Sequence, residues 1–216
     1  MPFAMTHLWI AQNLLKRTDR IKNPGQFILG ALAPDAIHFR DDYNSDMKKV
    51  SHLCVGDEKW GRLTNNGEWL SNVLDFLEEN RHGPNGDFIC GYCSHILADI
   101  ENNIRIWTPF LVESAKSGDK KEQGRYHKES EEADYALYLA IPQREALWNM
   151  LETSTSSDLE PMVFSREIDK MRDWVLNSRY TNKASVDLSQ NKYVTLSVLD
   201  KFIAEVTPIV ENELFG

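Results

Sequence analysis

The sequence predicts an all-α fold with a single domain over residues 1–216. Apolar residues recur at helical spacing along most of the chain. Short β-branched runs, such as residues 193–195, never alternate with polar residues long enough to form a sheet. No repeat of fixed period and no shift in composition marks a domain boundary, and 216 residues suffice for one domain to bury its own core.

The expected helices follow from apolar stripes and from the breakers between them. A stripe from Leu8 to Leu15 predicts an amphipathic first helix, and a stripe from Trp69 to Leu77 predicts another core-facing helix. Residues 88–107, entered through the breaker run 83–86, form the longest expected helix, and we expect it to be buried. Further helices are expected at about 122–139, 143–151, 165–177 and 195–214, the last kinked at Pro208, with loops at 39–49, 108–124, 153–163 and 180–191.

Composition disfavours several classes of function. The 33 acidic residues against 24 Lys and Arg leave a formal net charge of −9, so long nucleic acids are not expected as partners. The chain has no run near the ~20 apolar residues that cross a bilayer and no basic segment before its first apolar stretch. We therefore expect neither a transmembrane helix nor an export signal. Three cysteines, an odd number, favour reduced thiols and a cytoplasmic location.

The most informative chemistry lies in the long expected helix. His95 and Asp99 are four residues apart in an apolar context, so their side chains should lie about 5 to 6 Å apart on one face. No Lys or Arg precedes Arg105 on that helix, and an ionised carboxylate in a hydrophobic core is costly unless it is paired or binds a metal. A metal ion would satisfy both groups. The alternative is a surface-facing Asp99 beside a hydrogen-bonded core histidine.

The following helix repeats this spacing in an acidic stretch. His127 and Glu131 are four residues apart, and Glu129 and Asp134 lie close by. Helical bundles build dinuclear metal sites from acidic and histidine side chains that project inward, but a stretch this acidic is also typical of a solvated helix face. The two interpretations differ in whether Glu131 is buried.

Further candidates lie in the first quarter of the chain. Asp35 follows Pro34 and the apolar run 27–33, whose small residues permit close helix packing; helix capping is the alternative role for Asp35. His7 lies on the first helix, and His38 and His52 lie around a polar loop. His52 has no local signal for metal binding of its own.

In their order along the chain, these motifs resemble the zinc-dependent phospholipase C family. The resemblance covers about residues 1–140. It implies an all-α fold that holds up to three zinc ions and hydrolyses phosphodiester bonds of phospholipids, with related nucleases acting on nucleotide esters. The motifs that carry it are Thr6-His7, Gly30-Ala31-Leu32-Ala33-Pro34-Asp35 with His38, Ser51-His52, and Gly91-Tyr92-Cys93-Ser94-His95 through Asp99.

The resemblance also implies a role for each candidate residue. His52, His95 and Asp99 would bind one ion, and Asp99 would bridge to a second ion that His7 also holds. Asp35 would be a ligand or the base that orients the attacking water.

The third ion of the family is less well matched. By resemblance, His127 and Glu131 would hold it, unless Glu129 and Asp134 serve instead, and His38 would support the ligands without binding an ion. The secreted members use the amino group of a processed N-terminal tryptophan as a ligand, whereas this chain begins MPFAMTH. Two ions are therefore a plausible alternative to three. No strand pattern for the β-sandwich of the toxin members follows residue 140, so membrane lysis is not expected.

The expected chemistry follows from charge. Two divalent ions about 3.5 to 4 Å apart lower the pKa of a bridging water toward ~7 and neutralise phosphate oxygens. Ligands with nitrogen and oxygen atoms fit Zn²⁺ best, with Mn²⁺ or Fe²⁺ as substitutes. We expect hydrolysis of a small phosphodiester or phospholipid-like substrate. The alternative is a non-catalytic helical scaffold or interaction protein that retains a degenerate or structural metal site.

Three other signals carry less weight. Cys90 and Cys93 form a Cys-x-x-Cys pair, but no strand precedes it, which favours buried thiols over a redox site. An HD-type phosphohydrolase needs an adjacent His-Asp doublet, and none of the six histidines is followed by Asp. The tryptophans are expected in the core and not on a substrate-binding wall.

Overall fold

The computed structural model describes residues 3–54, 56–118, 121–142, 144–181 and 185–216, and over these residues the chain is an all-α bundle. Within them no strand forms, and Leu159 and Val163 make one isolated bridge. The helical elements are α1 (Ala4–Leu15), α2 (Pro24–Gly30), the 3₁₀ helix η1 (Ala33–Phe39), α3 (Ser45–Ser51), α4 (Asn66–Asn80), α5 (Gly86–Asn102), the π-helical turn η2 (Asn103–Trp107), α6 (Thr108–Ser117), α7 (Glu122–Ala140), α8 (Arg144–Glu152), α9 (Ser165–Trp174), the π-helical turn η3 (Val175–Arg179) and α10 (Leu196–Phe215).

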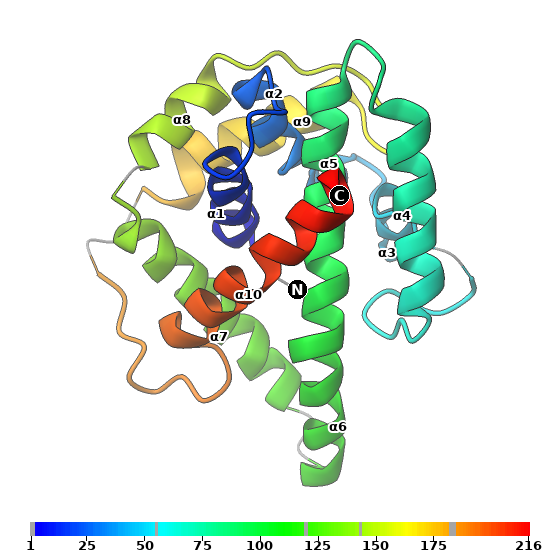
Figure 1. The fold of residues 1–216 in the computed structure, drawn as a ribbon. Helices are drawn as coiled ribbons and strands as arrows, with labels where there is room; N and C mark the ends of the chain where they lie inside the picture. Colours follow the sequence, from blue (N-terminus) through cyan, green and yellow to red (C-terminus); the bar gives the residue numbers. More distant parts are fainter. Residues whose placement is uncertain (1–2, 55, 119–120, 143, 182–184) are drawn as a thin grey trace.

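Helix α5 is the central element of the bundle. It runs through the middle of the molecule, and α1, α2, α4 and α10 pack around it (Figure 1). Almost every side chain of α5 is buried, in agreement with the expected long buried helix. Polar side chains in the middle of α5 are therefore buried, together with its apolar ones.

The contact between α2 and α5 is unusually close because a glycine stands on each side of it. A Cβ atom on Gly91 of α5 would overlap the carbonyl oxygen of Phe27, and a Cβ atom on Gly30 of α2 would overlap the carbonyl oxygen of Phe88. The backbones of the two helices thus touch directly. This contact brings the end of α2 and the following η1 segment against the middle of α5.

The loop expected at 108–124 is wrong, because α6 occupies residues 108–117. The predicted helix over residues 88–107 ends at Trp107, two residues before Pro109. A proline in the first turn of a helix removes no intrahelical hydrogen bond, and the π-helical turn η2 joins α5 to α6 without a loop. Helix α6 ends at Gly118, which has a positive φ of 67° that suits glycine.

The loop expected at 39–49 is also shorter than predicted, because α3 begins at Ser45. The side chain of Asn44 caps this helix by accepting hydrogen bonds from the backbone N–H groups of Asp46 and Met47. The helices expected at 122–139, 165–177 and 195–214 are confirmed within a few residues, and α10 continues through Pro208. The expected start of α8, Gln143, lies outside the described residues.

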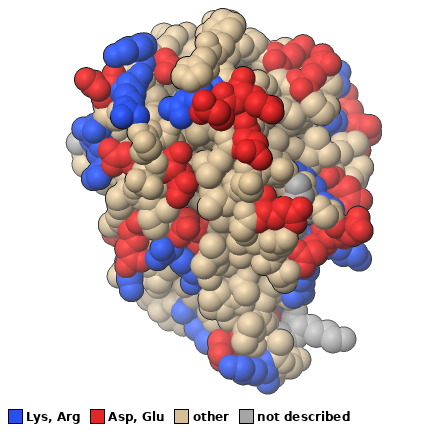
Figure 2. Space-filling view, turned by 45° about the vertical axis from the view of Figure 1, so that its right-hand side comes forward, with Lys and Arg blue, Asp and Glu red and all other residues tan. Residues whose placement is uncertain are grey.

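The surface bears mixed charge. On the face that Figure 2 shows, acidic and basic side chains are interspersed, and the described residues in that view form no large basic patch. Among the described helices, none has the length and apolar composition required to cross a membrane.

We predict that Gly91→Ala destabilises the protein by about 1 to 3 kcal/mol, because the added methyl group must push α2 away from α5. Chemical denaturation measures the change. Gly67→Ala on α4 is the matched control, since a Cβ atom there meets nothing within 4 Å, and it should be neutral or slightly stabilising. Equal effects of the two substitutions would contradict the close contact.

Candidate metal centre

Five of the predicted site residues meet in the interior, although four different elements carry them. His95 and Asp99 lie one turn apart on α5, and their side chains are only 1 to 2% exposed. His7 comes from α1, Asp35 from η1, and His52 follows the last residue of α3. The alternative role for Asp35, helix capping, is not observed, because no side chain caps η1 and the Asp35 carboxylate lies beside His52. The sequence-predicted cluster therefore exists.

The donor atoms are spaced for coordination more than for hydrogen bonding. His52 Nε2 lies 3.4 Å from an oxygen of Asp99 and 3.5 Å from an oxygen of Asp35. His7 Nε2 lies 3.6 Å from the other oxygen of Asp99. Hydrogen bonds between such groups would be about 2.7 to 3.2 Å long. Two ligands that bind one tetrahedral zinc ion at about 2.0 to 2.1 Å lie roughly 3.3 to 3.4 Å apart, which is close to the observed spacing.

Backbone carbonyls fix the orientation of two of the imidazoles. His95 Nδ1 is 2.8 Å from the carbonyl oxygen of Ala31, and His52 Nδ1 is 3.0 Å from the carbonyl oxygen of Lys48. A carbonyl only accepts hydrogen bonds, so each Nδ1 carries the proton and each Nε2 is left with a free lone pair. This arrangement is typical of metal-binding histidines.

The backbone of His52 is itself held in place by aromatic side chains. Trp69 Nε1 donates a hydrogen bond of 2.7 Å to the carbonyl oxygen of His52. The hydroxyl of Tyr92, on α5, donates to the carbonyl oxygen of Ser51. These contacts attach the end of α3 to α4 and α5, which explains how a residue without a local signal arrives at the site.

The cluster contains buried polar atoms that lack hydrogen bonds. They include both ring nitrogens of His7, both carboxylate oxygens of Asp99, and Nε2 of His52 and of His95. A buried polar group without a partner typically costs about 1 to 3 kcal/mol, so a cluster of them calls for a shared ligand. Two overlapping triads have donor atoms within 4.8 Å of one another: His7, His95 and Asp99, and Asp35, His52 and His95.

The protonation states favour a cation. Burial lowers the pKa of His52 to about 3 and that of His95 to about 4, and it lowers the pKa of His7 well below the usual value. These imidazoles are therefore neutral near pH 7, as metal ligands must be. Burial raises the pKa of Asp99 to about 7, because within the described residues no Lys or Arg lies at ion-pair distance from it. A divalent cation would favour its ionised form.

One residue at the site was missed by the sequence analysis. Lys48 Nζ lies 2.7 Å from an oxygen of Asp35, and the Lys48 side chain is only 7% exposed. Burial alone would raise the pKa of Asp35, but Lys48 and the imidazoles outweigh burial and hold this pKa well below its usual range. The signal that could have found Lys48 is its position four residues before His52, which places both residues on one face of α3.

The structure does not bring His127 and Glu131 into the cluster. Both side chains are exposed, and His127 lines the cavity beside the cluster without joining the groups of metal-ligating atoms. The buried acids of α7, which were the alternative pair, have other partners. Glu129 accepts hydrogen bonds from the backbone N–H groups of Tyr193 and Val194, and Asp134 accepts from the Tyr180 hydroxyl at 2.6 Å and from the Met5 N–H at 3.0 Å.

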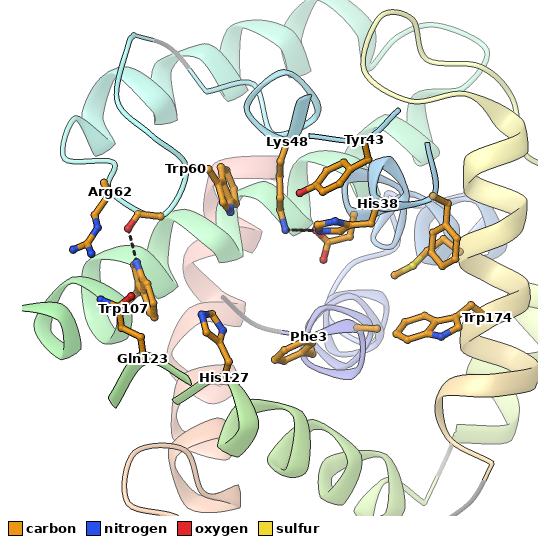
Figure 3. Close-up of a pocket in the computed structure, with 15 residues that line it drawn as sticks. Phe3, His38, Tyr43, Lys48, Trp60, Arg62, Trp107, Gln123, His127 and Trp174 are labelled. Atoms are coloured by element: carbon orange, nitrogen blue, oxygen red, sulfur yellow. Dashed lines mark hydrogen bonds and ion pairs between the residues drawn. The ribbon is translucent and has the colours of Figure 1, made fainter. Parts of the chain in front are cut away.

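A cavity of about 610 Å³ opens beside the cluster, and six of its fifteen lining residues are Phe, Tyr or Trp (Figure 3). Asp35 is the one acidic side chain among the described residues that line it, so this carboxylate borders both the cavity and the metal-ligating atoms. His38 also lines it, with Nε2 4.0 Å from Asp35. The tryptophans were expected in the core, and Trp69 and Trp107 are buried there, but Trp107 also lines this cavity together with the half-buried Trp60 and Trp174.

The Cys-x-x-Cys pair on α5 is unlike a redox site. Cys90 and Cys93 are both buried, and burial raises the pKa of each thiol. A thiol with a raised pKa is a poor nucleophile at neutral pH.

We predict that the protein purified without chelator contains zinc, and that removal of the metal by chelator lowers its melting temperature by at least about 5 °C. A metal in 100-fold excess over its Kd stabilises by about 2.7 kcal/mol, and each kcal/mol shifts a chain of this size by about 2 to 4 °C. Elemental analysis and thermal scans with added Zn²⁺ measure both effects. His52→Gln should lose the response, and the exposed His82→Gln should keep it. Less than one ion per chain would contradict the site.

We further predict that Asp99→Asn has opposite effects with and without metal. A carboxyl whose pKa rises on folding destabilises the folded state above its usual pKa, and this penalty is complete above the folded value of about 7. At pH 8 in chelator, the substitution should therefore raise the melting temperature by about 2 °C or more. It should also weaken the stabilisation by Zn²⁺. A lower melting temperature in chelator would mean that another group neutralises Asp99.

Comparisons of the chain with protein-family models, with curated proteins and with solved structures gave no match. The similarity to zinc-dependent phospholipase C consequently rests on the motifs in the first 140 residues. The geometry of the cluster is independent of that similarity.

Proposed function

We propose that this protein is a metal-dependent phosphoesterase, with zinc as its metal, that hydrolyses a small phosphodiester or phospholipid-like substrate. The observation that carries the proposal is the convergence of neutral imidazoles and carboxylates, with no hydrogen bonds at their inward-facing nitrogens or at Asp99, beside an open cavity. The metal ligands would be His7, Asp35, His52, His95 and Asp99.

Imidazole nitrogens together with carboxylate oxygens are typical zinc ligands, so we propose zinc as the metal. The same donors, without a thiolate, also suit Mn²⁺ and Fe²⁺, which are the proposed substitutes. When bound, divalent ions would activate water at neutral pH and neutralise the phosphate. One oxygen of Asp99 lies 3.6 Å from His7 Nε2 and the other lies 3.4 Å from His52 Nε2, so we propose two ions with Asp99 as the shared ligand. His95 would bind only one of them, because its Nδ1 is already bonded to Ala31.

The role proposed for Asp35 follows from its place between cluster and cavity. It is ionised at neutral pH, since its pKa is held well below the usual range against the effect of burial by Lys48 and the imidazoles. Its carboxylate can accept a proton or a hydrogen bond from a water molecule that enters from the cavity side. Asp35 would then both complete the ligand set and orient that water.

The cavity supports an anionic substrate with an apolar portion. Aromatic side chains that include Phe3, Trp60 and Trp174 form apolar walls, and Lys48 is a buried cation among them (Figure 3). A net-acidic protein can bind phosphate where local cations reverse the sign of the potential.

The proposed location is the cytoplasm. The thiols of Cys54, Cys90 and Cys93 are all unpaired, which suits a reducing compartment.

A structural metal site in a helical scaffold is the alternative, and turnover separates the two. We predict that the zinc-loaded protein hydrolyses bis(p-nitrophenyl) phosphate and that chelator abolishes this activity reversibly. Asp35→Asn and Asp99→Asn should each lower kcat/KM by at least ~100-fold, because each removes a charge at the reacting centre.

The release of p-nitrophenolate measures the rate, and His82→Gln, a change at an exposed histidine, is the control. A zinc-replete protein without turnover would favour the scaffold. Turnover that persists in chelator, or in Asp99→Asn, would show that it arises elsewhere.

A further inference from the structure

Lys48 is a buried ammonium group in the wall of the cavity. Its side chain is 7% exposed, although lysine is among the residue types that are almost never buried without a partner. It extends from α3 into the space that the labelled aromatic residues enclose (Figure 3). The fold therefore holds a positive charge in one place, next to the metal-ligating atoms.

The neighbours of the ammonium fix its position. Nζ lies 2.7 Å from Asp35 Oδ1 and 3.2 Å from His38 Nε2, and it lies 5.0 Å from the centre of the Trp60 ring. Asp35 Oδ1 is also 3.5 Å from His52 Nε2, a nitrogen of the second triad. Lys48 and His52 thus approach the same carboxylate oxygen of Asp35, and of the two only Lys48 also lines the cavity.

The hydrogen-bonding capacity of Lys48 is not used up by these contacts. An ammonium group has three protons to donate. Asp35 accepts one, and His38 Nε2 lies within hydrogen-bond distance to accept a second. One proton remains for a group that enters the cavity.

The charge balance indicates what that group is. The two carboxylates of the cluster, Asp35 and Asp99, can supply two negative charges, whereas Lys48 together with two divalent ions, if bound as proposed, would supply five positive charges. A phosphate group would bring negative oxygens into this excess of positive charge.

We propose that Lys48 contacts the substrate and donates a hydrogen bond to a non-bridging phosphoryl oxygen. This inference rests on the proposed function in one respect, since it assumes that the ligand carries a phosphate group. It goes beyond the metal centre because it assigns anion recognition to a side chain of the protein.

The competing role for Lys48 is that of a counter-ion that keeps Asp35 in place. A counter-ion would affect folding and metal content, but not phosphate affinity at full metal occupancy. Inorganic phosphate is therefore the probe. Its binding to the zinc-loaded protein can be measured by isothermal titration calorimetry, with the zinc content of every sample determined by elemental analysis.

We predict that Lys48→Met weakens phosphate binding by about 10-fold to 100-fold, the usual loss for one charge-assisted hydrogen bond, with zinc content unchanged. Lys48→Arg should retain part of the affinity. Lys49→Met is the matched control, because Lys49 is the next residue of α3 and its ammonium donates instead to the carbonyl oxygen of Gly56.

A second measurement distinguishes contact from support. In hydrolysis of bis(p-nitrophenyl) phosphate, Lys48→Ala should lower kcat, and added ethylammonium should restore part of it by entering the space left by the side chain. Neutral ethanol should not. A purely structural defect would not respond to the small cation.

The outcomes separate this inference from the proposed function. Phosphate affinity that is equal in wild type and Lys48→Met, or a loss of affinity accompanied by loss of zinc, would overturn the role of Lys48. Absence of phosphate binding by the zinc-loaded wild type would overturn it as well. Lys48-dependent phosphate binding without hydrolysis would support Lys48 as an anion-binding residue and would reject the phosphoesterase.

Discussion

The proposed metal site depends on a buried carboxylate that has no hydrogen-bond donor among the described residues. Asp99 lies on the most buried helix of the bundle, and the ring nitrogens of His7 and His52 approach it at 3.4 to 3.6 Å without a hydrogen bond. A core that included these groups for packing alone would be less stable than one with apolar residues of similar volume. A cation bound between these groups would compensate the cost of burying them. The helices α1 and α5, the η1 segment and the end of α3 each direct a potential ligand toward the same point.

The packing of the bundle and the orientation of the ligands have a common origin. Gly30 and Gly91 let α2 and α5 touch through their backbones, and the residue after Gly30 supplies the carbonyl oxygen that fixes the His95 ring. A side chain at either glycine would separate the helices and move that carbonyl away from His95. The small residues of the apolar run 27–33 thus serve the site through the fold, although none of them can bind a metal.

Local patterns predicted the parts of the site that depend on one helix, and they failed where the outcome depends on several. The pair His95 and Asp99 follows from helical spacing in an apolar context, whereas the same spacing at His127 cannot tell which face of α7 is buried. Lys48 was overlooked because it looked like part of a solvated loop, and only its tertiary contact with Asp35 gives it a role. The missed helix α6 has a similar cause, because a proline ends some helices and begins others.

The distribution of charge completes the argument. The chain carries a formal charge of −9, yet among the described residues the cavity beside the cluster is lined by one carboxylate, Asp35, and by two cationic side chains, the buried Lys48 and the exposed Arg62. Asp99 would partly neutralise the charge of cations bound in the cluster. On the side of the cavity, the ammonium of Lys48 would add to the positive potential of these cations. An anionic head group would be drawn to this wall, and the apolar remainder of the same molecule would lie against Trp60 and Trp174. In the proposed function, the site would therefore hold a ligand by its charged end, and the aromatic walls would select what is attached to it.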